Sequence, residues 1–383
     1  MEGKQQRVLI VFATPFLYGM ERGVIEIFDL LRPEIQPLFL IFRHTKLQET
    51  EQWLEIKGRE LPCVFFHEGH WPRFGMPRSI KQFFQMILAA LILNYDTLRA
   101  SVNCNVLYLP GDSYLYFSFI TAIFYKIKRR KIICHFHNLL QTPSKSLKLT
   151  SLFVTDYIHN TELGYQLVVE ANPFIKKKRN HIIAYPIREN SLVKDQELNG
   201  RLAGKRNILF IGQVAAHKGV DILLKAFKLV SSHYKDAALH IIGGGEQKYL
   251  ESLSEYVSGI EDKVKFWGYR NDISYFLSEA YIHVIPSPPS RCHESFGIVT
   301  AEAMAYGVPT VCFKSGASQE LVVNEQTGLV CEEESHESFA EGVQRFLNDP
   351  SFRNVCGKLA RKRFEENYSR AKIRDLWLKL FEG

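Results

Sequence analysis

Short apolar runs alternate with amphipathic segments along most of the chain. The apolar runs predict strands and the amphipathic segments predict helices that cover them, which is the pattern of a parallel α/β sheet. In the first half, a helix is expected near residues 23–31. The predicted strands of this half lie at 7–13, 35–42, 64–66, 106–109, 131–135, 152–154 and 181–184.

A second set of the same kind follows a polar, non-periodic stretch at about 191–206, which is typical of an inter-domain linker. A helix over about 220–232 carries its apolar residues on one face. The predicted strands lie at 207–212, 238–242, 264–266, 282–286, 310–313 and 328–330. The last helix has an apolar stripe that must pack on another element, formed by Ile373, Leu376, Trp377, Leu380 and Phe381.

The composition is that of an ordinary globular protein. A length of 383 residues suggests two or three domains, and 46% of the residues are apolar while 23% are charged. The seven cysteines are scattered without a C-x-x-C pair, which favours a reducing compartment over a disulfide framework or a zinc site. The N-terminus does not read as a signal peptide, and no apolar run reaches the roughly 18–20 residues that span a bilayer. A cytoplasmic location is therefore expected, with a peripheral position at the inner face of the membrane as the alternative.

The net charge of +7 is uneven, because residues 1–190 hold 24 Lys and Arg against 16 Asp and Glu. The basic residues concentrate at 126–131 and 176–179, where solvated loops are the commoner interpretation and attraction to an anionic membrane surface or acceptor is the alternative. Residues 83–92, with Lys81 and Arg99 nearby, could form an interfacial helix. This stretch is apolar on more than one face, however, so a buried helix is favoured. Nucleic-acid binding is not expected, because no nucleic-acid-binding motif accompanies the charge.

Two carboxylates eight residues apart are the most informative chemistry of the chain. Turn residues at 286–290 place Glu294 on a loop just ahead of a helix, and Glu302 falls inside that helix. A helix start offers unpaired N–H groups and a positive dipole end, which suit a phosphate. The loop carboxylate can accept hydrogen bonds from sugar hydroxyls, and the helical one can hold a ribose. This arrangement predicts recognition of a nucleotide sugar.

Four other turns in the second half are unremarkable alone but occur in a fixed order with the two glutamates. Lys218 precedes a helix, where its charge could contact a diphosphate. The glycines at 243–245 follow a strand and permit close backbone approach, although they form neither a dinucleotide fingerprint nor a P-loop. Small-residue turns follow at 307–310 and 316–320. Each could be an ordinary turn; together they indicate one site.

The segment from about 207 to 349 resembles the nucleotide-sugar domain of glycosyltransferase family 4, and the first half resembles this family only loosely. The resemblance implies an α/β protein of the GT-B fold, with two Rossmann-like, doubly wound domains facing a cleft. The acceptor-binding domain would be 1–195, and the nucleotide-sugar-binding domain would be 204–365. The terminal helix, 366–383, would cross back to the N-terminal domain.

The resemblance also implies residue roles. Glu294 would contact hydroxyls of the donor sugar, Glu302 would bind the ribose, and Lys218 would contact the diphosphate. The family usually has arginine where this chain has Gln213, so phosphate neutralisation would depend more on Lys218 and the helix ends. The remaining donor-site residues of this half would be Gly244, Arg270, Ser295, Phe296, Gly297 and Ile298, with the amides of Phe296 and Gly297 approaching the phosphate and sugar and Arg270 near the base.

Two features of the first half extend this resemblance. Gly19 belongs to a loop after the first strand that is similar to the glycine-rich N-terminal loop of the family. His137 follows another strand, at the position where the family often has a histidine near the reacting sugar. A histidine at a strand end can also be a cap or fill a cavity. The functional role is favoured because open α/β sheets bind ligands at the carboxyl ends of their strands.

The expected activity is that of a retaining, metal-independent glycosyltransferase. It would move a sugar from a nucleoside-diphosphate sugar, with UDP or GDP as the nucleotide, to a hydroxyl of a glycan or lipid-linked acceptor. Glu294, His137 and Lys218 would be its catalytic residues. No Asp-x-Asp motif is present, so no metal and no cofactor besides the donor are expected. The alternatives are a sugar-nucleotide epimerase of the same fold and a non-catalytic binding subunit of a polysaccharide assembly complex.

Overall fold

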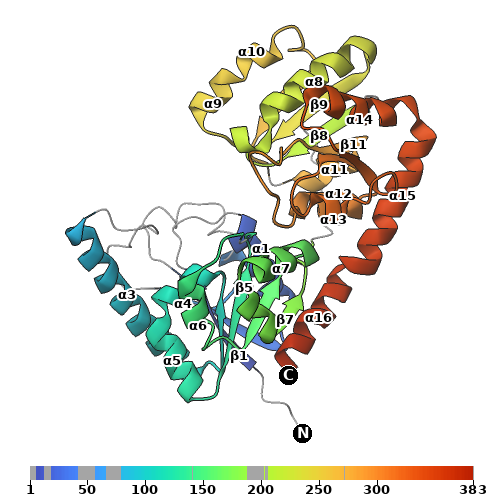
Figure 1. Cartoon of the computed structure of the whole chain (residues 1–383). Coiled ribbons are helices and arrows are strands. Elements are labelled where there is room, and N and C mark those ends of the chain that lie inside the picture. Colours follow the sequence, from blue (N-terminus) through green and yellow to red (C-terminus); the bar gives the residue numbers. More distant parts are fainter. Residues whose placement is uncertain are drawn as a thin grey trace. The chain divides into compact units, whose positions relative to one another are not determined.

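The chain forms two compact α/β units in the computed structural model, which describes residues 6–12, 19–41, 57–65, 79–139, 141–187, 202, 206–270 and 272–382. Unit 1 comprises Met1–Pro186 together with Ile373–Gly383, and unit 2 comprises Ile187–Lys372. Figure 1 shows a sheet with covering helices in each unit. The polar stretch predicted as a linker at 191–206 lies almost wholly outside the described residues.

The sheet of unit 1 has seven parallel strands in the order β3-β2-β1-β4-β5-β6-β7. Strand order reverses between β1 and β4, which are neighbours in the sheet. The central strands are apolar and buried, as strands covered by helices on both faces should be. The strands are β1 (Gln6–Phe12), β2 (Ile35–Ile41), β3 (Cys63–Phe65), β4 (Val106–Leu109), β5 (Lys131–Phe136), β6 (Asp156–His159) and β7 (Arg179–Ile182).

Helices of unit 1 include the last helix of the chain. The α-helices are α1 (Gly19–Leu30), α3 (Ile80–Ala100), α4 (Asp112–Phe117), α5 (Phe119–Ile127), α6 (Lys145–Thr150), α7 (Glu162–Ala171) and α16 (Arg370–Glu382), and the 3-10 helices are η2 (Ser101–Asn103) and η3 (Pro173–Lys177). Trp377 of α16 is fully buried, and its indole N–H donates to the carbonyl of Ala184 at 3.5 Å. Lys131 donates to the carbonyl of Leu380 at 2.6 Å. The expected return of the terminal helix to the N-terminal domain is therefore confirmed.

Unit 2 has six parallel strands in the order β10-β9-β8-β11-β12-β13. The strands are β8 (Arg206–Ile211), β9 (Ala237–Ile242), β10 (Val264–Gly268), β11 (Ile282–Ile285), β12 (Thr310–Phe313) and β13 (Gly328–Cys331). The helices are η4 (Ala216–Lys218), α8 (Val220–His233), α9 (Gln247–Ser252), α10 (Ser254–Val257), α11 (Ile273–Ser278), α12 (Ile298–Ala305), α13 (Ser318–Leu321), α14 (His336–Asn348) and α15 (Pro350–Asn367). Its main core joins side chains of α8 and α14 to those of the central strands, for example Phe227, Phe346 and Leu239.

One predicted strand is wrong. Residues 152–154 form a turn, and Leu152 is exposed, whereas the strand in this region is β6, which begins at Asp156. Asp156 is buried and pairs with Arg179 at 2.8 Å and with His181 at 3.1 Å on the neighbouring strand β7. A strand that begins with a buried, paired carboxylate does not show the apolar pattern by which strands are recognised.

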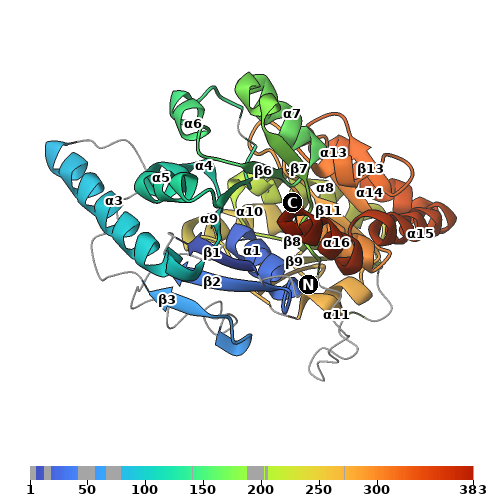
Figure 2. The same ribbon diagram turned by 90° about the horizontal axis from the view of Figure 1, so that it is seen from below.

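The preference for a buried helix over residues 83–92 is also wrong. Helix α3 lies at the outer side of unit 1 beside α5 (Figure 2), and most of its large apolar side chains are exposed. Its inward face is held by the buried Leu93 and by polar contacts, in which the Asn94 side-chain amide donates to the carbonyl of Phe117 and accepts from the Thr121 backbone amide. None of the described helices is both long enough and apolar enough to cross a bilayer.

Candidate functional site

Lys218 and Glu294, which are 76 residues apart in the sequence, meet in unit 2 at an ion pair of 2.7 Å. Lys218 ends η4 after strand β8, and Glu294 lies on the loop after strand β11. Strands β8 and β11 are the two neighbours between which the strand order reverses. Open α/β sheets bind ligands outside the carboxyl ends of strands at such a switch point. The structure thus brings two predicted site residues together at the place where this fold binds ligands.

The ion pair is largely shielded from solvent. The side chains of Lys218 and Glu294 are 22% and 14% exposed, and the Ser287 hydroxyl donates to the same carboxylate oxygen at 2.7 Å. Burial lowers the pKa of Lys218, but the charge and hydrogen bond of Glu294 outweigh it, so this pKa lies above its ordinary value. Lys218 therefore remains a cation throughout the neutral range.

Glycines allow the surrounding loops to approach Glu294 and its neighbours closely. A Cβ at Gly316 would lie 2.3 Å from the backbone oxygen and 2.6 Å from the backbone nitrogen of Glu294, and Gly316 has φ +54°. The next residue, Ala317, donates its amide to the Glu294 carbonyl at 2.7 Å. A Cβ at Gly219 would lie 2.0 Å from the carbonyl oxygen of Pro286. The backbone around the ion pair is thus fixed by loops that leave no room for a side chain.

Two helices of unit 2 begin beside these loops at left-handed glycines. Gly219 (φ +70°) precedes α8, and Gly297 (φ +85°) precedes α12, whose first residue is Ile298. Neither helix start carries a side-chain cap hydrogen bond. Their first N–H groups and positive dipole ends are therefore suited to an anionic group.

The segment that leads into α12 is anchored by Phe296. Its ring is 1% exposed and makes an edge contact with Tyr368, while Ser295 and Glu302 are half-buried. Glu302 lies inside α12, eight residues after Glu294 in the sequence, so the predicted placement of both carboxylates on a loop and a helix is confirmed. Their ligands stay predictions.

The other predicted donor residues of unit 2 lie on loops after three adjacent strands. Gln213 is exposed after β8, and Gly244 is exposed after β9, where its carbonyl accepts the Val214 amide at 2.8 Å. Arg270 follows the edge strand β10 and donates two hydrogen bonds to Asp272, at 2.8 and 2.6 Å. These hydrogen bonds lower the pKa of the Asp272 carboxyl. The roles of Gln213, Gly244 and Arg270 stay predictions.

His137, the predicted site residue of unit 1, lies directly after strand β5 and is buried. Its Nδ1 makes a short hydrogen bond with the Tyr185 hydroxyl, and the two rings stack at 17°. Its Nε2 is buried without a hydrogen-bond partner among the described residues. Burial holds the pKa of His137 well below its ordinary value, so the imidazole is neutral. Gly19 is the first residue of α1 in the same unit.

The neighbouring histidine has a different environment. His135 has both ring nitrogens satisfied, Nδ1 by the Tyr108 hydroxyl and Nε2 by the Asn160 side chain at 2.7 Å. His135 and His137, which lie at the end of the same strand, thus differ in their hydrogen bonding. Of the two rings, only that of His137 has a nitrogen without a hydrogen-bond partner. Sequence reasoning missed Tyr185 and Ser287, and no sequence signal pairs them with the residues they hold. It assigned the turn at 316–320 to the site but gave Gly316 no contact with Glu294.

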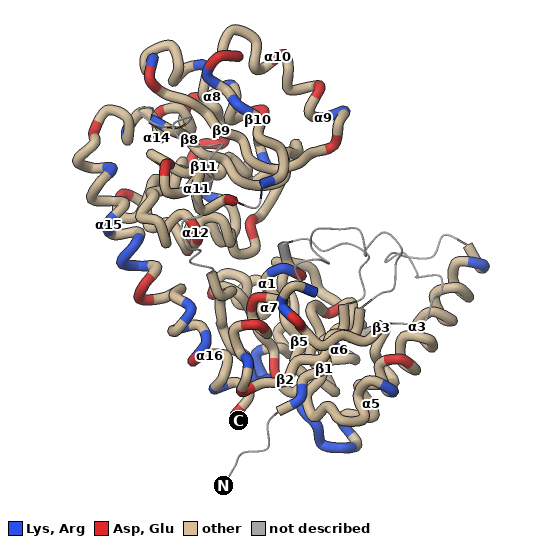
Figure 3. Tube along the Cα trace, turned by 180° about the vertical axis from the view of Figure 1, so that it is seen from behind, with Lys and Arg blue, Asp and Glu red and all other residues tan. Residues whose placement is uncertain are grey.

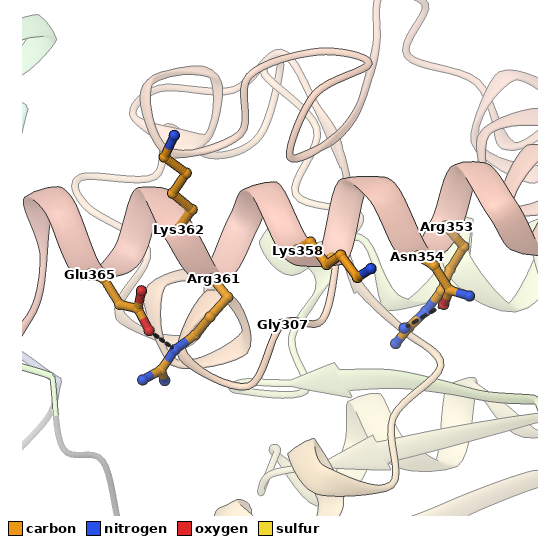
Figure 4. Close-up of a pocket in the computed structure, with 8 residues that line it drawn as sticks. Gly307, Arg353, Asn354, Lys358, Arg361, Lys362 and Glu365 are labelled. Carbon is orange, nitrogen blue, oxygen red and sulfur yellow. Dashed lines mark hydrogen bonds and ion pairs between the residues drawn. The ribbon is translucent and has the colours of Figure 1, made fainter.

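A cavity elsewhere in unit 2, of about 410 Å³ along α15, is not the predicted site (Figure 4). Its arginines are engaged in holding α15 to the rest of the unit. Arg353 donates to the carbonyls of Tyr281 and Ala280 at 2.8 and 3.3 Å. Arg361 donates to the Ala305 carbonyl and pairs with Glu365 at 2.6 Å. The arginine side chains that line this cavity therefore serve to hold α15 in place.

The two doubly wound units define the class of fold as GT-B. The chain matches the crystal structure of HepE of Anabaena in complex with UDP, with a TM-score of 0.77 and 17% identity, over 98% of this chain and 99% of that one. Residues 194–363 match the family model of the glycosyl transferases group 1.

Two relatives are similar over this region. An uncharacterised glycosyltransferase of Haemophilus influenzae is 32% identical over 204 residues, which are 53% of this chain and 55% of the relative. An uncharacterised glycosyltransferase of Methanocaldococcus jannaschii is 36% identical over 169 residues, which are 43% of this chain and 42% of the relative. The matched region thus spans about half the length of each relative.

Proposed function

We propose that the chain is a glycosyltransferase that moves a sugar from a nucleoside-diphosphate sugar to a hydroxyl of a glycan or lipid-linked acceptor. The observation that carries this proposal is the Lys218–Glu294 pair at the switch point of unit 2, beside two helix starts without side-chain caps. The family of residues 194–363 supports it, as do the structures of HepE with UDP and with UDP-glucose.

In this proposal the diphosphate of the donor binds between Lys218 and the starts of α8 and α12. The ammonium group and the backbone N–H groups neutralise the charge that develops on the leaving phosphate. They take the place that a divalent cation has in metal-dependent transfer, so we propose a metal-independent reaction with no cofactor besides the donor. Gln213 keeps a hydrogen-bond donor near this position but adds no charge.

Donor binding exchanges one partner of Lys218 for another. The Glu294 oxygen that now accepts from Lys218 becomes available to the hydroxyls of the sugar, while Ser287 keeps the carboxylate oriented. Each charge-assisted hydrogen bond to the sugar is worth about 1.5–3 kcal/mol. Glu302 would hold the ribose, and the backbone of residues 295–298 would approach the sugar and phosphate.

We propose that transfer retains the anomeric configuration. The bond between the anomeric carbon and the phosphate oxygen breaks while the acceptor oxygen bonds to the same face, and the departing phosphate receives the acceptor proton. Glu294 orients the sugar and does not attack it. The neutral His137 contributes Nε2, its open nitrogen, to a hydrogen bond with a hydroxyl of the reacting sugar.

Calorimetric titration with UDP and GDP, followed by turnover assays with their sugars, tests this function. Wild-type chain should bind one nucleotide, and Glu302→Ala should weaken that affinity about tenfold or more, since a hydrogen bond to a charged group is worth about 1.5–3 kcal/mol. Glu337→Ala, at an exposed glutamate of α14, is the matched control and should leave the affinity unchanged. An unchanged affinity of Glu302→Ala would remove the ribose assignment.

The same assays separate the alternatives. A transferase hydrolyses its donor slowly and needs an acceptor for rapid turnover, whereas an epimerase would convert the donor with no acceptor present. A binding subunit would bind a nucleotide sugar and turn over none of the donors with any acceptor. Either of these two results would contradict the proposed activity.

A further inference from the structure

Helix α3 of unit 1 has the reverse of the usual polarity for a surface helix. Its buried side chains include three polar ones, Asn94, Asp96 and Thr97. The Asn94 side chain alone makes four hydrogen bonds, to Ala90, Phe117 and Thr121. The helix is therefore fastened to the unit by polar contacts in its C-terminal half together with the buried Leu93, while most of its other large apolar side chains stay exposed.

Those apolar side chains point away from the unit. They are Ile80 (78% exposed), Phe83 (46%), Phe84 (64%), Ile87 (40%), Leu88 (59%), Leu91 (51%) and Tyr95 (61%). Single exposed apolar residues are common on protein surfaces, but a contiguous set of seven along one helix marks an interaction site. The 21 residues of α3 make a rod of about 30 Å at 1.5 Å per residue, so the apolar surface is long and narrow.

The segment that carries this apolar surface holds several exposed cations and, among its described residues, no exposed carboxylate. Residues 80–155 hold nine Lys and Arg but only two acidic residues, of which Asp96 is buried and Asp112 is half-buried. Figure 3 shows basic positions at both ends of α3 and in the loop after α5. The exposed cations are Lys81, Arg99, Lys126, Lys128, Arg129, Lys145 and Lys148. Arg130 joins the loop after α5 to the end of α3, because it donates to the carbonyls of Ser101 and Cys104 at 3.0 and 2.9 Å.

We infer that this face of unit 1, formed by α3 and the basic loop after α5, docks on an anionic lipid bilayer. Apolar side chains flanked by cations fit a bilayer surface, which has acyl chains beneath negative head groups. Contact between two copies of the face would bring like charges together, which disfavours self-association. This inference is independent of the catalytic proposal, because it concerns no residue of the site in unit 2.

Co-sedimentation of the full chain with phospholipid vesicles tests this inference. We expect the chain to sediment with vesicles that contain phosphatidylglycerol and to remain largely in solution with vesicles of phosphatidylcholine alone. Added salt should release it, because ions screen the attraction between surface charges. The double variant Phe84→Ser/Leu88→Ser should weaken binding by at least about tenfold, since each side chain loses most of its apolar area.

A matched variant controls for the general loss of exposed apolar surface. Val355→Ser/Leu359→Ser changes two exposed apolar residues of α15 in unit 2 and should bind vesicles like the wild type. The variant Lys126→Gln/Lys128→Gln should weaken binding about tenfold or more, because each cation near an anionic surface contributes about 1 kcal/mol. Circular dichroism and nucleotide titration should be unchanged in all three variants.

Three results would overturn the inference. The first is wild-type binding by Phe84→Ser/Leu88→Ser. The second is absence of binding to anionic vesicles by a monomeric wild-type chain, which would mean that the face is covered from within the chain. The third is a wild-type dimer in solution that is lost in Phe84→Ser/Leu88→Ser, which would show that the face is a contact between two copies of the chain. Failure of nucleotide binding would instead refute the proposed function and leave the vesicle result standing.

Discussion

The Lys218–Glu294 pair shows how one residue contact connects two predictions from distant parts of the sequence. Each side chain alone lies on an ordinary turn. The two side chains form an ion pair at the switch point because their loops follow the neighbouring strands β8 and β11. The sequence identified both residues. It did not identify Ser287, whose hydroxyl donates to the same oxygen, because a serine among prolines has no distinguishing pattern.

Replacing Glu294 should abolish transfer without unfolding the chain. Glu294→Ala removes at least two hydrogen bonds to the sugar, so transfer should fall by about 10² to 10⁴, at about 1.5–3 kcal/mol for each bond. The variant also leaves Lys218 without its carboxylate, which lowers the pKa of Lys218 because the charge and hydrogen bond of Glu294 no longer oppose the effect of burial. Steady-state kinetics with a saturating donor measures the loss.

Glu332→Ala is the control for this prediction. It removes the carboxylate from an exposed ion pair with Lys314, at 3.2 Å, in the same unit. Exposed pairs contribute about 0–1 kcal/mol, so both stability and transfer should stay near the wild-type values. Near-normal turnover in Glu294→Ala would show that the carboxylate does not orient the sugar.

Tyr185 acts on His137 as a positioning residue. Its hydroxyl bonds to His137 Nδ1 and thereby sets which tautomer the imidazole adopts. Tyr185→Phe should leave a mixture of tautomers, visible in the ¹⁵N chemical shifts of the imidazole. The value of kcat should fall about tenfold, because a lost hydrogen bond costs roughly 1–3 kcal/mol, while nucleotide affinity should not change.

The matched variant for this prediction is Tyr108→Phe. It removes the equivalent hydroxyl from Nδ1 of His135, whose other nitrogen is already bonded to Asn160. It should cost similar stability but retain kcat. If Tyr185→Phe kept both the wild-type tautomer and the wild-type kcat, Tyr185 would have only a structural role.

At the scale of elements, apolar runs located every strand of unit 2 to within about two residues and all strands of unit 1 except β6. Strand β6 was not predicted because its first residue is a buried aspartate that pairs with side chains of the neighbouring strand β7. The exposure of the apolar side chains of α3 was also not predicted, because periodicity shows which residues share a face of a helix but not which face packs on the protein. That choice was made by Asn94 and its partners on α4 and α5. Polar contacts between distant segments are the part of this fold that the sequence pattern does not reveal.

The loop at Gly316 should be essential for the shape of the site. Gly316→Ala places a Cβ against the backbone of Glu294 and also strains a left-handed residue, so it should cost about 2–5 kcal/mol of stability and abolish transfer. Gly259→Ala separates the two causes. Gly259 is also left-handed (φ +85°), but a Cβ there would meet nothing within 4 Å. It should cost only about 1–2 kcal/mol and retain transfer. Thermal unfolding and turnover of both variants would measure the difference, and equal losses would contradict the role of close packing.

At the scale of the whole molecule, the chain passes twice between its units, at 186–187 and at 372–373. The terminal helix α16 therefore belongs to unit 1 from Ile373 onward, although its first three residues belong to unit 2. The apolar stripe of this helix made its docking predictable, and the buried Trp377 confirms that it contributes to the core of unit 1. Unit 1 also holds most of the buried histidines whose pKa is lowered, which gives the two units different responses to acid.

Mild acid should destabilise unit 1 more than unit 2. Burial lowers the pKa of His135 to about 3 and of His159 to about 4, and it holds that of His137 well below its ordinary value. In unit 2, burial lowers the pKa of His283 to about 3. Unfolded histidine titrates near pH 6.5, so below that pH the unfolded chain binds protons that the folded units do not. Stability is therefore complete above about pH 6.5 and is lost as the pH falls toward 4, by roughly 2 kcal/mol for each histidine at pH 5.

Hydrogen exchange read by mass spectrometry at pH 7 and at pH 5 resolves the two units peptide by peptide. Protection of β4–β6 should fall more than protection of β8–β12, because three of the buried histidines with a lowered pKa in the described part of the chain lie in unit 1 and one lies in unit 2. His159→Gln should reduce the acid sensitivity of unit 1 by about a third, since it removes one of the three proton-binding differences. His233→Gln, at an exposed histidine, should change nothing. Equal loss of protection in both units would show that the buried histidines do not control the acid response.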